Sequence, residues 1–311
     1  MSARVLVLGS TDFTLATADA IECAGVKVGA IAYVGDTFRI SYAKGGAKNF
    51  RSADIAGWCA ENNAEAIHYT NIDALAKAVA NDRFSLCVLA GWYHLVPGSF
   101  RRIFEHGCIG FHASLLPKLR GGAPLSWAIL SDLSETGLSL FEVGDGVDDG
   151  PLYAQERIAI GSETYVSELI DETRRAADRI IQRCLPGILS GRVCARPQEG
   201  APSYCLQRTP EDGRVDWSNS AEEINRLVRA VSRPYPGGLA RLNCQEIAIH
   251  RTEVTTDIEL RGTPGQIAIL PGCTWPIIAC GRGCIAILEA EFEDGRDALP
   301  VLRMSSNMRL A

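Results

Sequence analysis

The chain has 311 residues, of which 47% are hydrophobic and 22% are charged, and its formal net charge is −6 at pH 7. This length accommodates two modest domains, or one large domain with an appendage, and the composition is typical of a soluble globular protein. No run approaches the ~20 apolar residues of a membrane span, no secretion signal is seen, and the acidic balance offers no electrostatic footprint for a nucleic acid.

The eleven cysteines are scattered from Cys23 to Cys284 and include no Cys-x-x-Cys pair. A disulfide framework belongs to short secreted chains, and structural zinc needs four ligands at tight spacings. We therefore expect neither disulfides nor a metal site. Because free cysteines pack like small hydrophobic residues, the pattern indicates reduced, mostly buried thiols in a cytoplasmic protein.

The first half of the chain alternates strand-like apolar runs with helix-like stretches. This alternation predicts an α/β, Rossmann-like fold with a mostly parallel sheet, helices on both faces, and functional loops at the carboxyl ends of the strands. The first strand–helix turn, residues 9–12, lacks the glycine fingerprint of dinucleotide binding, which argues against a nicotinamide dehydrogenase. The strands are expected over residues 4–8, 26–33, 66–68, 84–89, 108–111 and 137–143. The helices are expected over residues 13–24, 52–62, 99–104 and 162–189.

The second half has the pattern of a separate β-rich unit. Residues 220–223 read Ser-x-x-Glu, a capping box that opens a helix, and the Pro- and Gly-rich run 234–238 follows that helix. With residues 197–201 as a linker, we expect a catalytic domain over residues 1–200 and a β-barrel-like or sandwich domain over residues 205–311. The short apolar segments of this second domain are residues 239–242, 246–250, 265–269, 277–279 and 284–289.

His112 is the first candidate for chemistry, because it closes a predicted buried strand where an imidazole faces a ligand cleft more often than a core. Asp148 lies in the Gly-rich loop 144–150, which can return a carboxylate to that imidazole. Such a contact would fix the ring tautomer and raise the basicity of the ring. The alternatives are a structural histidine and, for Asp145, Asp148 and Asp149, solvated turn residues.

Residues 109–124 read IGFHASLLPKLRGGAP, and residues 144–150 read GDGVDDG. These runs resemble the signature H-x-S-L-L-P-x-x-R-G-x-x-P, followed by G-x-D-x-G, of the formyltransferases that use 10-formyltetrahydrofolate. The resemblance covers nearly the whole chain and the order of its two domains. Further matches are residues 91–92 before 96–97, residues 215–217, and residues 229–230 before 234–237.

In this family an amine attacks the formyl carbon held on the folate, while a histidine and an aspartate manage the protons and the charge of the tetrahedral intermediate. The resemblance implies that His112 is this histidine and Asp148 its carboxylate partner. A competing Ser–His–Asp hydrolase would need a Gly-x-Ser-x-Gly elbow, which Ser114 lacks. The resemblance assigns the folate to Gly91, Trp92, Leu115, Leu116, Pro117, Asp145, Gly146 and Val147. It assigns the acceptor side to Ser114, Arg120, Gly121 and Gly122.

Gly110 is a departure from the family pattern, which has asparagine two residues before the histidine. The asparagine side chain is an oxyanion donor, and loss of one such donor costs ~10²–10³ in rate. Three explanations are open. In the first, the enzyme formylates, and a water, the Gly110 N–H or protonated His112 is the hydrogen-bond donor to the oxyanion. In the second, the space left by the asparagine side chain admits an altered acceptor or altered one-carbon chemistry. In the third, the fold binds a folate or an acceptor and catalyses little.

Three acceptor classes suit the family, namely methionyl-tRNA, amino-sugar nucleotides and small amines of specialised metabolism. From Cys205 onward the chain has twelve arginines, no lysine and fourteen acidic residues, whereas a tRNA-binding domain needs a basic face. We therefore expect a small-molecule amine, with methionyl-tRNA as the alternative and with Arg120 and Lys118 as partners for acceptor phosphates. Two questions stay open. The donor is 10-formyltetrahydrofolate or another one-carbon folate, and the oligomeric state, which includes a homodimer among its alternatives, is not determined by the sequence.

Overall fold

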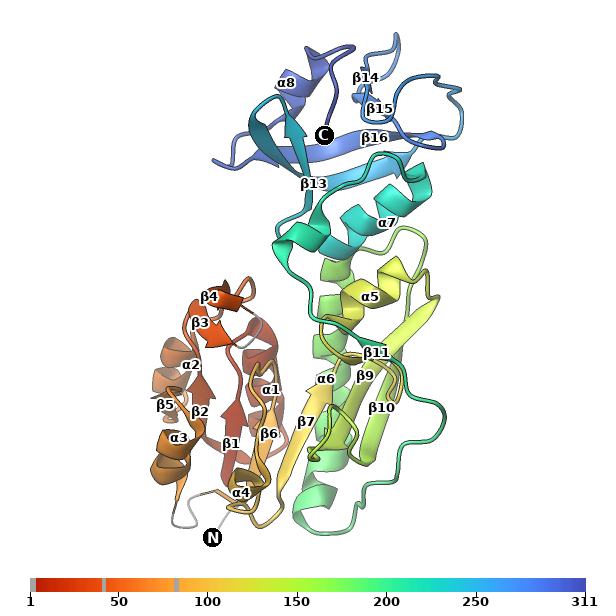
Figure 1. Cartoon of the computed structure of the whole chain (residues 1–311). Helices are drawn as coiled ribbons and strands as arrows, with labels where there is room; N and C mark the ends of the chain where they lie inside the picture. The colour runs from red at the N-terminus through yellow and green to blue at the C-terminus, as the bar shows by residue number, and fades with distance from the viewer. Residues whose placement is uncertain (1–3, 41–42, 81–83) are drawn as a thin grey trace. The chain divides into compact units, whose positions relative to one another are not determined.

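The computed structural model describes residues 4–40, 43–80 and 84–311, and the chain consists of two units (Figure 1). The first unit extends to Pro124 and resumes over Glu135–Ala159 and Ile170–Cys205. The second unit comprises Leu125–Ser134, Ile160–Leu169 and Leu206–Ala311.

Within the described residues, a seven-stranded sheet forms the centre of the first unit, in the order β10-β9-β7-β6-β1-β2-β5. Its strands pair in parallel from β5 to β7, whereas β9 and β10 pair antiparallel at one end. The mostly parallel sheet is therefore confirmed. The parallel strands are β1 (Arg4–Leu8), β2 (Lys27–Tyr33), β5 (Glu65–His68), β6 (Leu86–Leu89) and β7 (Cys108–His112). The antiparallel strands are β9 (Glu135–Glu142) and β10 (Leu152–Ala159).

Helices cover both faces of this sheet because successive side chains of a strand alternate between its faces. Leu6 of β1 belongs to a core cluster with Leu75 of α3 and Phe100 of α4. On the opposite face, Phe111 of β7 meets Phe13 of α1 edge to face, with 5.6 Å between the ring centroids. The helices of this unit are α1 (Asp12–Cys23), α2 (Ile55–Glu61), α3 (Ile72–Val79), α4 (Gly98–Arg101) and, from Ile170 on, α6 (Val166–Leu189).

The helix α6 begins at Val166, so its expected start at residue 162 is wrong. The hydroxyl of Thr164 accepts the N–H of Gly161 at 2.9 Å, and the Glu168 carboxylate accepts the N–H of Tyr165 at 2.7 Å. The Thr164 contact closes a turn over residues 161–164, and the Glu168 contact caps the helix at Tyr165, so the helix begins after the turn. The sequence analysis also missed α3, β10, α5 (Pro124–Leu130) and the hairpin of β3 (Thr37–Ile40) and β4 (Ala43–Lys48).

The second unit contains an antiparallel sheet in the order β12-β13-β16-β15-β14, which the C-terminal segment 307–311 closes. Leu310 bridges to Leu242 at one edge of the sheet, and Arg309 bridges to Gln266 next to the other edge. This closure agrees with the predicted barrel-like domain. The strands are β12 (Gly238–Leu242), β13 (Gln245–Val254), β14 (Ile267–Ala268), β15 (Ile277–Ala279) and β16 (Cys284–Phe292). The helical segments are α5, α7 (Ala221–Val231), α8 (Leu299–Arg303) and the 3₁₀ turn η1 (Pro210–Gly213).

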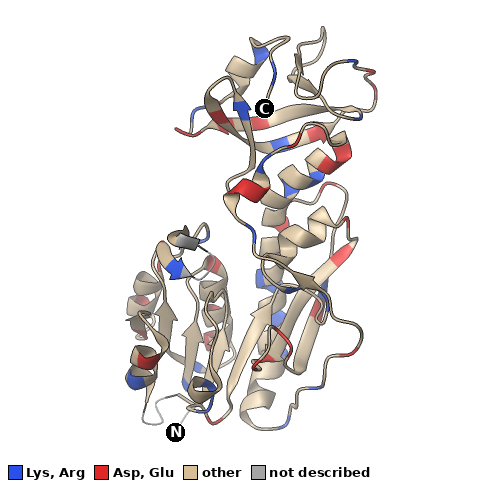
Figure 2. Cartoon of the chain, in the orientation of Figure 1, with Lys and Arg blue, Asp and Glu red and all other residues tan. Residues whose placement is uncertain are grey.

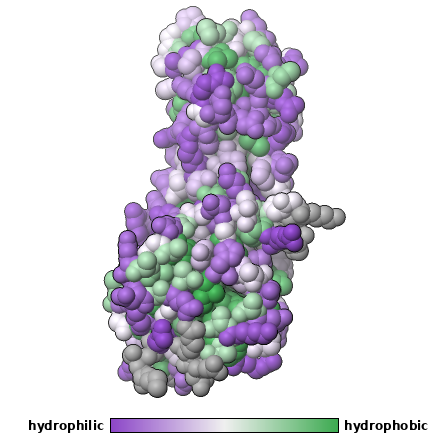
Figure 3. Space-filling view, turned by 90° about the vertical axis from the view of Figure 1, so that its left-hand side faces the viewer, coloured by the Kyte–Doolittle hydropathy of each residue, from purple (hydrophilic) through white to green (hydrophobic). Residues whose placement is uncertain are grey.

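Across the described part of the chain, no helix combines the length and the apolarity that crossing a membrane requires. On the face shown in Figure 3, apolar side chains lie among hydrophilic ones and gather mainly over the first unit. The eleven cysteines are free thiols, and seven of them are buried.

Leu310 tests whether the closing segment stabilises the second unit, because its side chain is 1% exposed within the core of that unit. Leu310→Ala should lower the free energy of unfolding by about 2–5 kcal/mol, since deleting buried methyl groups leaves a cavity. Urea denaturation, monitored by amide hydrogen exchange in β12 and β13, measures the loss of stability. The control Met304→Ala, at a position 81% exposed, should change stability by less than about 0.5 kcal/mol. Equal effects of the two variants would mean that the closing segment adds no stability.

Candidate active site

His112 and Asp148 meet although β7 and β9 run in opposite directions. His112 is the last residue of β7, whereas the end of β9, at Glu142, pairs with Ile109 near the start of β7. Loop 143–151 therefore folds back along the sheet. It brings Oδ2 of Asp148 to 3.3 Å from Nδ1 of His112.

The His112 ring, 8% exposed, lies between two hydrogen-bond acceptors. Nε2 is 2.7 Å from the carbonyl oxygen of Leu119, which can only accept, so Nε2 carries a hydrogen and donates it. Nδ1 then faces Asp148 Oδ2, which also accepts the N–H of Gly121 at 2.9 Å. Nδ1 and this carboxylate oxygen lie within hydrogen-bond distance of each other when a proton is between them. The pair can therefore hold a proton at the end of β7.

The acceptor of Nε2, the carbonyl of Leu119, is held in place by Ser203 and Cys205, and none of these three residues was predicted from the sequence. Leu119 has a φ of 55°, in the left-handed region that residues with side chains rarely adopt. Its N–H donates to the hydroxyl of Ser203 at 2.9 Å. Burial and, to a smaller extent, the charge of Asp148 raise the pKa of Cys205 to about 11, so Cys205 remains a thiol and donates to the Leu119 carbonyl at 3.3 Å. No local sequence signal marks Ser203 or Cys205.

Ser114 lies in the buried wall of the site. Its side chain is 1% exposed, and its hydroxyl donates to the carbonyl of Lys118 at 2.6 Å, so it is not directed at His112 as a nucleophile would be. The Ser139 hydroxyl donates to the Ser114 carbonyl, and the Gln155 amide donates to the Leu116 carbonyl. Residues 114–117, with a cis Leu116–Pro117 bond, are therefore anchored to β9 and β10. In the same loop, Leu115 packs against Gly137 of β9.

Arg120 and Gly121 form the short strand β8 (Arg120–Gly121), which pairs in parallel with β11 (Tyr204–Cys205). A Cβ at Gly121, where φ is 105°, would lie 2.4 Å from the Cys205 carbonyl oxygen, so this close approach requires glycine. Gly122 donates its N–H to the same carbonyl at 2.9 Å. The Arg120 guanidinium lies over the ring of Tyr204 and, within the described residues, forms no ion pair, so its charge is uncompensated.

The predicted folate residues lie on three segments, namely residues 91–92 after β6, residues 115–117 after β7 and residues 145–147 after β9, and α4 links the first and the last of these. Arg101 of α4, the helix that follows Gly91-Trp92 in the chain, forms an ion pair with Asp145. On the first segment, Trp92 packs edge-on against Tyr69, and in the described part of the molecule its buried indole N–H has no acceptor. On the last segment, Val147 next to Gly146 is 50% exposed. Trp92 thus has an unused hydrogen-bond donor beneath the surface, and Val147 presents exposed apolar surface.

Gly110 lies two residues before His112 and on the same face of β7. A Cβ at this position would lie 3.3 Å from Cγ2 of Val143, 3.4 Å from Cε1 of Phe141 and 3.5 Å from Cβ of Leu89. All three neighbours are apolar, and the first two contacts are tight. An asparagine here would have to displace apolar side chains.

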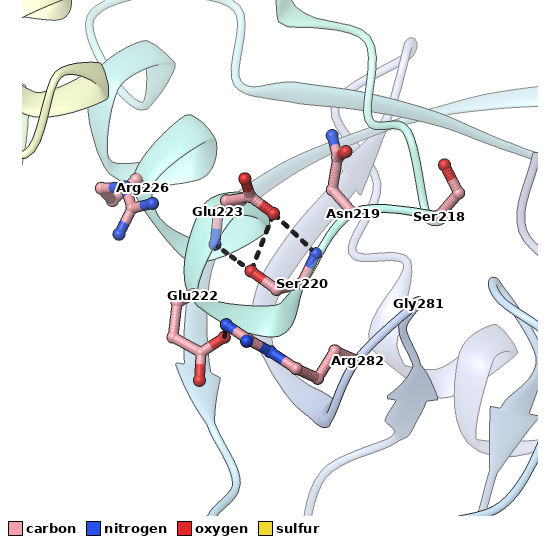
Figure 4. A pocket seen from close by; sticks show the side chains of 8 residues that line it. All are labelled: Ser218, Asn219, Ser220, Glu222, Glu223, Arg226, Gly281 and Arg282. Carbon is pink, nitrogen blue, oxygen red and sulfur yellow. Dashed lines mark hydrogen bonds and ion pairs between the residues drawn. The ribbon is translucent and has the colours of Figure 1, made fainter.

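A hollow of about 600 Å³ lies at the N-terminus of α7 in the second unit (Figure 4). The helix terminus is already capped, because Ser220 accepts the N–H of Glu223 and the Glu223 carboxylate accepts the N–H of Ser220. Arg282 pairs with Glu222 at 3.8 Å. The helix terminus and Arg282 therefore already have polar partners within this hollow. Among the described residues, no group of three His, Cys, Asp or Glu side chains is arranged to hold a metal ion.

The buried imidazole of His112 and the partly buried carboxylate of Asp148 thus lie beside each other at the end of a parallel strand, in an α/β unit that a closed β-rich unit follows in the chain. The model of the formyl transferase family matches residues 3–185, and the model of its C-terminal domain matches residues 208–301. The methionyl-tRNA formyltransferase of Sorangium cellulosum is 30% identical over 225 residues, which cover 72% of each chain. That of Thermodesulfovibrio yellowstonii is 29% identical over 272 residues, or 86% of this chain and 84% of the relative. The chain belongs to the formyl transferase family.

Solved structures share the fold at lower identity. HypX from Aquifex aeolicus in complex with tetrahydrofolic acid matches with a TM-score of 0.66 and 15% identity over 96% of this chain. The chain spans 45% of HypX, less than half its length. An N-formyltransferase from Helicobacter canadensis, in complex with folinic acid and dTDP-3-aminofucose, matches with a TM-score of 0.65 and 15% identity. That match covers 92% of this chain and 98% of the other.

The tight surroundings of Gly110 are testable by restoring the family residue. Gly110→Asn should lower the free energy of unfolding by about 1–3 kcal/mol, because extra atoms in a packed region force their neighbours to move. Urea denaturation measures the change. The double variant with Val143→Ala should recover at least half of the loss, since Val143 makes the tightest contact. Unchanged stability of Gly110→Asn would mean that open space does lie beside Gly110.

Proposed function

We propose that this protein transfers the formyl group of 10-formyltetrahydrofolate to the amine of a small-molecule acceptor. The observation that carries the proposal is the His112–Asp148 pair, at 3.3 Å, in a chain of the formyl transferase family. Proteins of similar fold have been solved with tetrahydrofolic acid or folinic acid bound, which supports a folate donor. The unpartnered Trp92 N–H and the half-exposed Val147 fit a pteridine-like ring, and the donor supplies the formyl carbon that the amine attacks.

His112 and Asp148 have the arrangement needed to manage the proton of this attack. An amine that adds to a formyl carbon becomes positively charged and must lose a proton before the tetrahedral intermediate collapses. The pair can take up this proton at Nδ1, beside the Asp148 carboxylate. The proton then passes to the folate nitrogen as the bond between that nitrogen and the formyl carbon breaks, so that tetrahydrofolate leaves and the formylated amine remains. The bond from Nε2 to Leu119 keeps the ring from rotating while this happens.

The negative charge on the formyl oxygen needs stabilisation that Gly110 does not supply through a side chain. The Gly110 backbone lies inside the sheet, in register with Leu89 of β6 and Phe141 of β9, so its N–H belongs to a strand ladder. A water is then left as the direct hydrogen-bond donor. The protonated His112 ring adds its charge to this stabilisation.

The charge distribution of the second unit supports a small acceptor. Basic and acidic residues are interspersed along the backbone of this unit in Figure 2. Arg214 pairs with Glu246, and Arg233 pairs with two glutamates of β16. These ion pairs reduce the positive charge that the two arginines can offer to the phosphates of an RNA. In the first unit, the uncompensated guanidinium of Arg120 beside the exposed ring of Tyr204 suits a single anionic group, such as the phosphate of an amino-sugar nucleotide.

Methionyl-tRNA is the second candidate acceptor. It is favoured by the relatives, since the protein of Sorangium cellulosum that covers 72% of this chain is a methionyl-tRNA formyltransferase. This acceptor would require arginines outside the ion pairs to form a continuous basic surface.

Catalysis by the pair is tested by removing each partner. His112→Ala and Asp148→Asn should each lower kcat/KM by about 10²–10⁴-fold, the usual contribution of a positioned acid–base group. The release of tetrahydrofolate and the mass of the product are measured together. The control His106→Ala, a histidine of the same unit outside the site, should stay within about twofold. Full turnover in either variant at the pair would exclude this mechanism.

The acceptor class is tested with a panel of amines that includes amino-sugar nucleotides and methionyl-tRNA. We expect a product heavier by one formyl group from a small amine and little from methionyl-tRNA. Binding of tRNA that weakens steeply between 50 and 200 mM salt would favour the second candidate, because phosphate contacts release counterions. A folate complex without turnover on any amine would contradict the proposed transferase.

A further inference from the structure

The segment between α6 and the second unit, residues 196–205, enters the active site. Arg196 exchanges two backbone hydrogen bonds with Leu152 at the start of β10, at 2.7 and 2.8 Å. Ser203 donates its N–H to the carbonyl of Pro117 and accepts the N–H of Arg120. Tyr204 and Cys205 then pair with Arg120 and Gly121 as β11 and β8. This connecting segment, part of which the sequence suggests as a linker, is therefore bonded to both loops of the site.

Gln198 is the residue of the connecting segment that joins these two loops. Its Nε2 donates to the carbonyl oxygens of Asp148 and Gly150, at 2.8 Å each. Its Oε1 accepts from Nη2 of Arg120 at 2.7 Å and lies 3.3 Å from Nε of the same guanidinium. A single neutral amide thus uses both of its N–H groups on the aspartate loop and its oxygen on the arginine of the motif.

The aspartate loop needs such support because of its backbone. Asp148 has a φ of 49°, a left-handed conformation that costs a residue with a side chain free energy unless its surroundings impose it. The direction of its carboxylate toward His112 and Gly121 depends on that conformation. The two bonds from Gln198 act on the carbonyl of Asp148 itself and on the carbonyl two residues later.

We infer that Gln198 is a positioning residue, whose amide holds the Asp148 loop so that its carboxylate meets His112. The inference rests on the proposed function for its kinetic consequences only. The neutral amide also leaves the charge of Arg120 uncancelled, which a carboxylate at the same position would not do.

The test compares Gln198→Glu and Gln198→Ala with the control Glu199→Gln, a change at the next, exposed position of the same segment. Gln198→Glu keeps the size of the side chain and loses its donors. Both changes at Gln198 should lower kcat by about 10–100-fold, with the KM for the folate donor within about threefold, because a misplaced group impairs chemistry more than donor binding. The control should stay within about twofold.

A second readout does not need turnover. The N–H of Gly121 donates to the Asp148 carboxylate, so its hydrogen exchange, followed by NMR, reports the position of that carboxylate. Exchange of Gly121 should accelerate by about tenfold or more in Gln198→Glu and stay unchanged in Glu199→Gln. If Gln198→Ala does not fold, the near-isosteric variant Gln198→Glu alone tests the positioning role of Gln198.

A kcat of Gln198→Glu within twofold of the wild type would overturn the inference. If the wild-type protein formylates no amine, the proposed function fails, and the exchange of Gly121 then decides on Gln198 alone. Unchanged exchange in Gln198→Glu would in that case overturn the positioning role, whereas accelerated exchange would support it.

Discussion

The contact between Nδ1 of His112 and the carboxylate of Asp148 is the constraint on which the rest of the site depends. The imidazole arrives at the end of a parallel strand, as functional groups of α/β sheets commonly do. The carboxylate arrives from a strand of the opposite direction, so its loop must fold back and adopt a left-handed backbone at Asp148. Strained conformations of this kind persist only where neighbouring groups impose them. Here those groups are the Gly121 N–H and the Gln198 amide.

The segment that connects the two units is consequently part of the site. It binds the carbonyl side of the Asp148 loop through Gln198, and it holds the Leu119 backbone, which accepts from His112, through Ser203 and Cys205. The three groups set the positions of both acceptors that flank the imidazole. A site built in this way places its charge accurately, which matters because electrostatic stabilisation in a buried site depends on donors and charges that are already in position. Gly110 increases this dependence, since apolar side chains surround the position where the family has an asparagine.

Membership of the formyl transferase family and the choice of acceptor depend on different parts of the molecule. Family membership follows from motifs and fold that extend over both units. The acceptor is selected by a small number of charged and aromatic groups, which can diverge while the fold is retained. In the second unit Arg241 of β12 and Arg233 of the turn after α7 are paired with glutamates, whereas Arg120 in the first unit has no carboxylate partner among the described residues. This difference is one of the observations on which the proposed small-molecule acceptor rests.

The sequence by itself determined the parallel sheet, the β-rich second unit and the candidates His112 and Asp148. These features follow from local apolar periodicity and from a motif that lies within two short runs. It did not identify α3, the antiparallel β10 or the hairpin of β3 and β4, because these segments are only four to eight residues long and a pattern of that length is compatible with more than one structure. Only the tertiary structure decided that Val143 and Phe141 surround Gly110 and that Gln198 reaches Asp148, 50 positions earlier, and Arg120, 78 positions earlier. Contacts over such separations arise when the chain folds back on itself, and no local pattern of residues encodes them.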